Sequence, residues 1–226
     1  MPDIPNEIQS LADAYSAKIK DLTNSYMENC LQLHKDGPPS PELAEPTTLS
    51  WPLYPWWNIF LIGPIQYVGP PHVGPFMPSK IISHKNRAFM VACVWRNPGP
   101  IGWSLGSPSA CQVMNGRKFQ INFEVVDLTN VSGGPDLEKV EDTFHNAPDC
   151  LQCYVREIKN FPEPDQGRPN LYNLYATIDI TEAEQPMAGF ATWVLDLDSE
   201  PHWMWFPRVR PEWQYDQPAQ FMVYKR

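Results

Sequence analysis

The chain has 226 residues, which is enough for one medium-sized domain with a hydrophobic core. Its 26 prolines are about twice the usual share, and because proline fixes φ and lacks an amide donor, they exclude a mostly helical protein. The 17 basic and 26 acidic residues give a net charge of −9, which disfavours general nucleic-acid binding.

The start of the chain and the cysteines bear on the compartment. Residues 1–7 contain neither the basic flank nor the apolar run of a secretory signal. No apolar stretch approaches the ~18 residues that suggest a membrane span, so a membrane partner is not expected. The five cysteines are an odd number and are scattered apart from Cys150 and Cys153. This pattern does not indicate a disulfide framework, and it predicts a reduced, cytoplasmic protein.

Residues 6–35 carry the pattern of a long amphipathic helix. Apolar side chains recur three or four positions apart, which places them on one stripe. The stripe contains Ile8, Ala12, Tyr15, Ile19, Leu22, Tyr26, Cys30 and Leu33. Gly37, Pro38 and Pro39 end the segment. The stripe must be buried either on the chain's own β domain, which we favour, or against a second copy, which predicts a homo-oligomer through this helix.

Residues 37–79 have a different character, because 11 prolines interrupt the segment too often for a helix. Aromatic residues lie between the prolines, so the segment is not a polar linker. Short extended pieces are expected at 57–61 and 65–68. We interpret 37–79 as an arm that wraps over the edges or faces of a sheet.

From about residue 80 onward, apolar and polar residues alternate, which is typical of strands with one buried face. The alternation is clearest over 119–125, 172–180 and 191–197. The run 88–95 is apolar on both faces and predicts a central strand, and 221–224 predicts a last strand. The segments 171–181 and 188–198 are expected to pair antiparallel.

Residues 135–146 depart from this alternation. Leu137, Val140 and Phe144 are three and four positions apart, and Pro135 suits the first turn of a helix, so a short helix is predicted there. Residues 150–161 fit a helix or a strand equally, and the prolines on either side favour a strand.

Together these patterns predict a mainly β protein. It is an antiparallel β-sandwich, immunoglobulin-like or related, with a long N-terminal helix and a short helix inserted near 135–146. The expected domains are a helical arm over 1–36, the wrapping segment over 37–79 and the sandwich core over 80–226. Residues 37–226 are expected to form one domain.

One acidic segment is a candidate metal site. Asp196, Asp198, Glu200 and His202 are two positions apart, so on a strand they share one side. Carboxylates and an imidazole suit a divalent cation such as Ca²⁺ or Mn²⁺. However, strand side chains two apart are separated by about 6.6 Å, and Pro201 ends a strand. The favoured interpretation is therefore a solvated outer face that runs into a turn.

The pair Cys150 and Cys153 has the spacing of redox and zinc motifs. A redox site needs a βαβ setting and a structural zinc site needs two more ligands, of which His145 alone is near in the sequence. We therefore interpret the two cysteines as incidental and Cys93 as a small core residue. No cofactor motif is present, and no cofactor is predicted.

Two aromatic clusters are the most distinctive feature of the chain. They are Trp51, Tyr54, Trp56 and Trp57, and then Trp203, Trp205, Arg208, Arg210 and Trp213. Tryptophan and tyrosine often dominate binding surfaces, and arginine can stack on an indole ring. The alternative interpretation is that the rings clamp proline-rich segments to the sheet.

These features predict a non-catalytic binding or assembly protein with an aromatic-rich surface and a protein or carbohydrate ligand. The first alternative is a metal-assisted hydrolase or a sugar-active enzyme that uses Asp196, Asp198, Glu200 or His202. The second is a membrane-surface or pore-forming protein, which the negative charge disfavours on anionic lipid. Nucleic acid is not expected as a partner.

Overall fold

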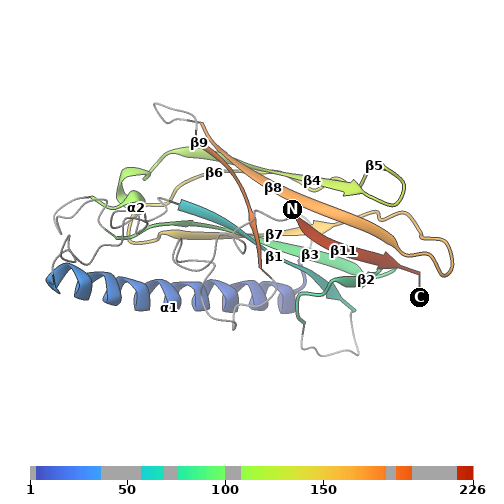
Figure 1. Ribbon diagram of the computed structural model, residues 1–226, viewed down its shortest axis with the longest axis horizontal. Helices are drawn as coiled ribbons and strands as arrows, with labels where there is room; N and C mark the ends of the chain where they lie inside the picture. The colour runs from blue at the N-terminus through green and yellow to red at the C-terminus, as the bar shows by residue number, and fades with distance from the viewer. Residues whose placement is uncertain are drawn as a thin grey trace, which may run out of the picture.

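The computed structural model describes residues 4–36, 57–68, 76–99, 108–181, 187–194 and 218–225. In this part of the chain a seven-stranded sheet, a four-stranded sheet and one long helix follow one another from top to bottom in Figure 1. The predicted mainly β, sandwich-like architecture with an N-terminal helix is confirmed. None of the helices in the described residues is long and apolar enough to cross a membrane.

The four-stranded sheet is the middle layer. Its order is β10 (Thr192–Val194), β1 (Trp57–Tyr67), β3 (Arg87–Arg96) and β7 (Leu151–Ile158). Strand β3 is antiparallel to both of its neighbours, and every residue from 88 to 95 is buried, so the predicted central strand is confirmed. Met90 and Ala92 face the core between the sheets, whereas Val91 and Cys93 face the helix.

The seven-stranded sheet is the outer β layer. It has the order β2 (Ile81–Ser83), β11 (Ala219–Tyr224), β8 (Asn170–Ile180), β4 (Lys118–Asp127) and β5 (Ser132–Gly133). Two further strands complete it, because β6 (Val140–Thr143) pairs with β4 and β9 (Met187–Phe190) pairs with β8. Its inward side chains, among them Tyr172 and Ile178, form the core against the four-stranded sheet. Strands predicted at 119–125, 172–180 and 221–224 are confirmed.

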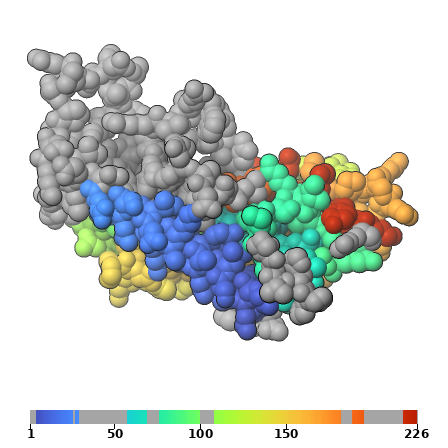
Figure 2. Space-filling view, turned by 90° about the horizontal axis from the view of Figure 1, so that it is seen from below, coloured from blue at the N-terminus to red at the C-terminus, as the bar shows by residue number. Residues whose placement is uncertain are grey.

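Helix α1 (Asn6–Asp36) covers the other face of the four-stranded sheet, and it runs across the view of Figure 2 in blue. Ile8, Ala12 and Ile19 from the predicted stripe are buried against that sheet. The indole nitrogen of Trp95 donates a hydrogen bond of 3.1 Å to Thr23 Oγ1. Docking on the chain's own domain is therefore confirmed for this part of the stripe. The homo-oligomer stays a prediction.

The sheets are mixed, so the prediction of an antiparallel sandwich is wrong in two pairings. Strand β10 runs parallel to β1, and β2 runs parallel to β11, while the other pairs are antiparallel. The first parallel pair arises where the chain changes sheets. Strand β9 pairs with β8 as predicted, and the amide of Ala191 then bonds to Ala176 O before β10 joins β1 in the other sheet. The immunoglobulin-like type stays a prediction.

The helix predicted near 135–146 is wrong, because this segment contains strand β6. Val140 and Phe144 are both buried in the core between the sheets. Residues four apart share one face of a strand as well as one face of a helix, so their spacing did not separate the two structures. The second helix in the described residues is α2 (Ala110–Val113), which begins with a capping box between Ser109 and Gln112.

Part of the predicted wrapping segment lies inside a sheet. Residues 57–67 form one strand, β1, between β10 and β3. Its register to β3 shifts between Ile62 and Ile65. Gly63 lies at this shift with φ +133°, and a Cβ there would lie 2.7 Å from Met90 Sδ, so the bend requires glycine. The domain boundaries stay a prediction.

Candidate functional site

Most residues singled out by the sequence lie outside the described residues. They are Trp51, Tyr54, Trp56, Trp203, Trp205, Arg208, Arg210 and Trp213 of the aromatic clusters, and Asp196, Asp198, Glu200 and His202 of the acidic segment. Trp57 is described, and it packs on the core between the sheets. A Cβ on Gly189 would lie 2.6 Å from Trp57 Cη2, so the ring rests on that glycine. Trp57 therefore fits the clamp interpretation better than an open surface.

Four of the five cysteines form disulfides, so the interpretation of Cys150 and Cys153 as incidental is wrong, and so is the expectation that the chain has no disulfide framework. Cys93 and Cys153 join the neighbouring strands β3 and β7, and Cys111 and Cys150 join α2 to the start of β7. The bonded partners are 60 and 39 positions apart in the chain. The close pair Cys150 and Cys153 thus belongs to two different disulfides, which the fold brings together across long sequence distances.

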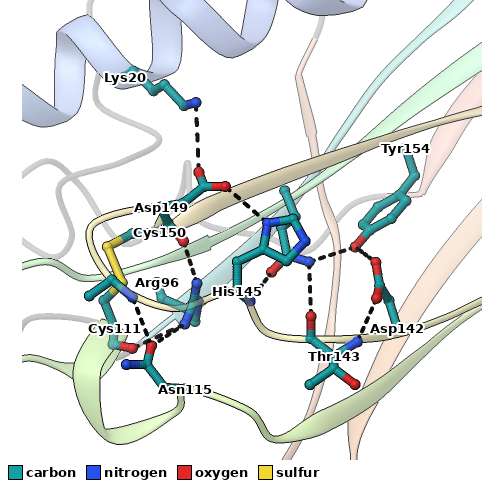
Figure 3. Close-up of polar contacts among 12 residues, drawn as sticks. Lys20, Arg96, Cys111, Asn115, Asp142, Thr143, His145, Asp149, Cys150 and Tyr154 are labelled. Carbon is teal, nitrogen blue, oxygen red and sulfur yellow. Dashed lines mark hydrogen bonds and ion pairs between the residues drawn. A yellow bond between two sulfur atoms is a disulfide. The ribbon is translucent and has the colours of Figure 1, made fainter.

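A fully buried guanidinium lies beside one of these disulfides (Figure 3). Arg96 Nη1 donates to Cys111 O at 3.0 Å and to Asn115 Oδ1 at 3.3 Å, and Nη2 donates to Asp149 O at 2.6 Å. The ring of Phe144 lies 4.8 Å from the guanidinium carbon. Burial lowers the pKa of Arg96 to about 10, so the group is charged at neutral pH. It ties β3, α2 and the turn before β7 together.

His145 and Asp149 form an exposed pair next to this guanidinium. His145 Nδ1 lies 2.9 Å from Asp149 Oδ2, and Lys20 Nζ of α1 lies 3.7 Å from the other carboxylate oxygen. Burial raises the pKa of Asp149, but the bond from His145 and the charge of Lys20 outweigh it, and the pKa falls below its usual value. Histidine with aspartate is part of many nucleophilic triads. In the described part of the chain, no hydroxyl or thiol is bonded to the His145 ring.

Tyr154 anchors a second polar cluster between the two sheets (Figure 3). Its hydroxyl donates to Asp142 Oδ2 at 2.7 Å and accepts from Gln152 Nε2 at 2.9 Å. Burial and the bond to Asp142 raise the pKa of Tyr154. Gln152 also donates to Thr143 O and accepts from the backbone amide of His145. These groups satisfy one another, and they join β7 to β6.

A different arrangement occupies the face of the seven-stranded sheet that turns away from the four-stranded sheet. On β4, β8 and β11 every second side chain points outward, and the outward set is rich in amides and hydroxyls. We call six of these outward residues the amide face: Gln120, Asn122, Asn173, Tyr175, Thr177 and Gln220. The pairing register puts Asn122 opposite Thr177, and Asn173 opposite Gln220.

Two chains of hydrogen bonds run across the amide face. Gln120 Nε2 donates to Asn122 Oδ1, and Asn122 Nδ2 lies 3.4 Å from Asp179 Oδ2. Gln220 Nε2 donates to Asn173 Oδ1 at 3.2 Å, and Asn173 Nδ2 donates to the Tyr175 hydroxyl at 3.3 Å. A primary amide has two donors and a carbonyl with two acceptor sites. These bonds therefore fix the side chains and leave further donors and acceptors for a ligand.

An exposed ring and two carboxylates flank the amide face. Phe190 of β9 lies opposite Thr177 and is 57% exposed. Glu124 and Asp179 are exposed on the same side of β4 and β8. In the described part of the chain, neither carboxylate takes part in an ion pair.

The alternation of apolar and polar residues in β4 and β8 is visible in the sequence, but alternation alone indicates only that one side of a sheet faces solvent. The usable signal was the residue type, since amides and a tyrosine hold these positions and lysine holds few of them. Among the described residues, no three His, Cys, Asp or Glu side chains gather to hold a metal ion. No protein-family model matches the chain, and a search of curated proteins finds no match.

Proposed function

We propose that this chain is a non-catalytic binding protein whose ligand lies on the amide face. The observation that carries the proposal is the pair of hydrogen-bonded chains that hold amide and hydroxyl groups in fixed positions over three strands. Preorganised groups lose little conformational freedom when a ligand binds, so their hydrogen bonds contribute more to affinity. A rigid sheet also positions such groups better than loops do.

The Arg96 cluster supports this choice by contrast. The Arg96 side chain is buried, and its Nη1 and Nη2 atoms donate to backbone carbonyls, so these donors serve the fold. Arg96 Nε is buried without a hydrogen-bond partner among the described residues. The amide face is more open, because Gln220, Phe190 and the two carboxylates are exposed and Gln120, Asn122, Tyr175 and Thr177 are partly exposed, whereas Asn173 is buried. Exposed donors and acceptors that are already ordered can bind a ligand at little cost in conformational entropy.

The two disulfides favour an oxidising compartment over the cytoplasm predicted from the sequence, since such bonds persist mainly where thiols are not kept reduced. Alkylation followed by mass spectrometry tests this on protein isolated without reductant. Four of the five cysteines should resist alkylation until a reductant is added, which leaves Cys30. The alkylation is done in denaturant, because Cys93 and Cys111 are fully buried and would resist it even as free thiols, and five reactive thiols would contradict the prediction.

The binding function is tested with Thr177→Arg, which places a long charged side chain in the centre of the amide face. Gln166→Arg is the matched control, because Gln166 is exposed and lies outside this face. Wild type, variant and control are applied to one array of immobilised glycans and peptides. Ligands retained by wild type and control but lost by Thr177→Arg support the proposal. Equal retention by all three proteins, or no retention by wild type, would overturn it.

A further inference from the structure

We infer that the amide face takes an unbranched, neutral carbohydrate chain. This inference rests on the proposed binding function and adds the chemical class and the length of the ligand. Three properties of the described residues carry it: the hydrogen-bonding groups, the exposed ring and the charge around them.

The hydrogen-bonding groups match adjacent hydroxyls. A sugar hydroxyl both donates and accepts, and two neighbouring hydroxyls can meet the donor and the acceptor of one amide together. Asn122 uses part of its hydrogen-bonding capacity within the sheet, and Thr177 adds a hydroxyl opposite it. Asn173 is buried, and it positions the Gln220 amide and the Tyr175 hydroxyl through its own hydrogen bonds. A peptide strand would bond to a sheet edge through its backbone, whereas these groups stand on the middle strands β8 and β4.

The exposed ring supplies an apolar surface of the right shape. Phe190 is opposite Thr177, and Tyr175 lies two positions farther along β8, a diagonal neighbour at roughly 7–8 Å. The C–H face of a pyranose ring is flat and apolar, so it can pack on an aromatic ring while its hydroxyls reach the amides. Phe190 is the one large, exposed hydrophobic side chain that the structure describes on β4, β8, β9 and β11. A protein partner would need a broad apolar interface, whereas one exposed ring is enough to pack against a sugar.

The charge of the region disfavours polyanions, because the outward side of β4 and β8 carries two exposed carboxylates and one lysine, Lys118. Glu124 and Asp179 stand beside the amides without an ion-pair partner in the described residues. Phosphates, sulfates or uronates on this face would be repelled, and the chain as a whole has a net charge of −9. Nucleic acid, anionic lipid and acidic glycans are therefore disfavoured, and a neutral glycan remains.

The extent of the face indicates a chain of several sugars rather than a single one. From Asn173 to Asp179 the outward side chains span six residue steps of β8, which is about 20 Å along the strand. This length accommodates several linked rings. The affinity should therefore rise with the length of the oligosaccharide until the face is filled.

The inference is tested by affinity gel electrophoresis in neutral glucans and in polygalacturonate, followed by calorimetry with gluco-oligosaccharides of increasing length. The proteins are wild type, Asn122→Ala and Phe190→Ala. The matched controls are Asn146→Ala and Met77→Ala, which remove an exposed amide and an exposed hydrophobic side chain outside the face. Thermal unfolding of each variant checks that it is folded.

We expect wild type to bind at least one neutral glucan, more tightly as the chain lengthens. Asn122→Ala and Phe190→Ala should each weaken that binding about tenfold, and the controls should not. Binding that survives both variants places the site elsewhere, and binding to polygalacturonate alone overturns the charge argument. If no glycan binds but the array yields a peptide that Thr177→Arg loses, this inference fails while the proposed binding function stands.

Discussion

The two outward faces of the β layers differ in chemistry, although both belong to similar twisted sheets. The outer face of the four-stranded sheet is apolar, with Val91 and Phe89 packed under helix α1. The outer face of the seven-stranded sheet carries amides and hydroxyls that bond to one another, with no helix of the described residues over it in Figure 1. The first face therefore serves stability, and the second is available for a ligand. The largest changes in stability should come from the first face and the largest changes in binding from the second.

The same substitution on each face gives the largest contrast. Val91→Asn puts an amide into the apolar layer under α1, where it finds no partner, and should lower the free energy of unfolding by about 4 kcal/mol. Thr177→Asn on the amide face should change it by less than about 0.5 kcal/mol. Urea unfolding without reductant measures both. Similar losses for the two variants would mean that the second face is also a packed interface.

Removing the buried guanidinium should have the next largest effect. Arg96→Ala leaves a cavity and takes the donors away from the carbonyls of Cys111 and Asp149, so the free energy of unfolding should fall by about 3 kcal/mol. Arg156→Ala is the control, because this arginine bonds backbone carbonyls from a more exposed position. Equal, small losses for both arginines would show that the buried cluster does not hold the end of the sheet together.

Loss of the disulfide between β3 and β7 should cost about 2–3 kcal/mol. The double variant Cys93→Ala with Cys153→Ala keeps the backbone pairing of the two strands but removes the covalent link between two residues that are 60 positions apart in the chain. Hydrogen exchange should then rise in β7 and stay unchanged in β8 of the other sheet. Equal increases in both sheets would show that the two β layers unfold together and are not separate in stability.

The smallest expected effect is a pH dependence from the edge strand β7. Burial raises the pKa of Glu157, but donation from Arg87 at 2.6 Å and the nearby Lys159 outweighs it, so the pKa lies below 4.5 in the folded chain. A carboxyl with a lowered pKa stabilises the fold above its unfolded pKa, and this stability is lost as the pH falls through the folded pKa.

The variant Glu157→Gln removes this contribution. Between about pH 5 and pH 3 the wild type should lose about 1 kcal/mol more stability than the variant. A profile of Glu157→Gln that coincides with wild type would contradict the role of this ion pair.

Most helices and strands of this chain can be predicted from its sequence, because the buried face of each element sets the spacing of its apolar residues. The seam of α1 and the alternation in β4 and β8 predicted those elements, and the doubly apolar run 88–95 predicted the middle strand. The sequence predicts a helix over 135–146 because Val140 and Phe144 are four positions apart, a spacing that fits one face of a helix as well as one face of a strand. In this region the pairing of β6 with β4 decided the structure.

Long-range features were not readable in the same way. The parallel pairs and the two disulfides depend on which distant segments meet, and neither composition nor spacing encodes that. The amide face also depends on which strands pair. The sequence indicated the solvent-facing positions of β4 and β8. It did not indicate the register that places Asn122 opposite Thr177 and Asn173 opposite Gln220.

Side-chain amide NMR during titration with a neutral gluco-oligosaccharide tests the central claim most directly. The side-chain NH₂ signals of Asn122, Asn173 and Gln220 should shift together and saturate with one affinity, while those of Asn146 and Gln166 and the backbone signals of α1 stay in place. Shifts confined to α1 or to the Arg96 cluster, with the amide face unchanged, would contradict it.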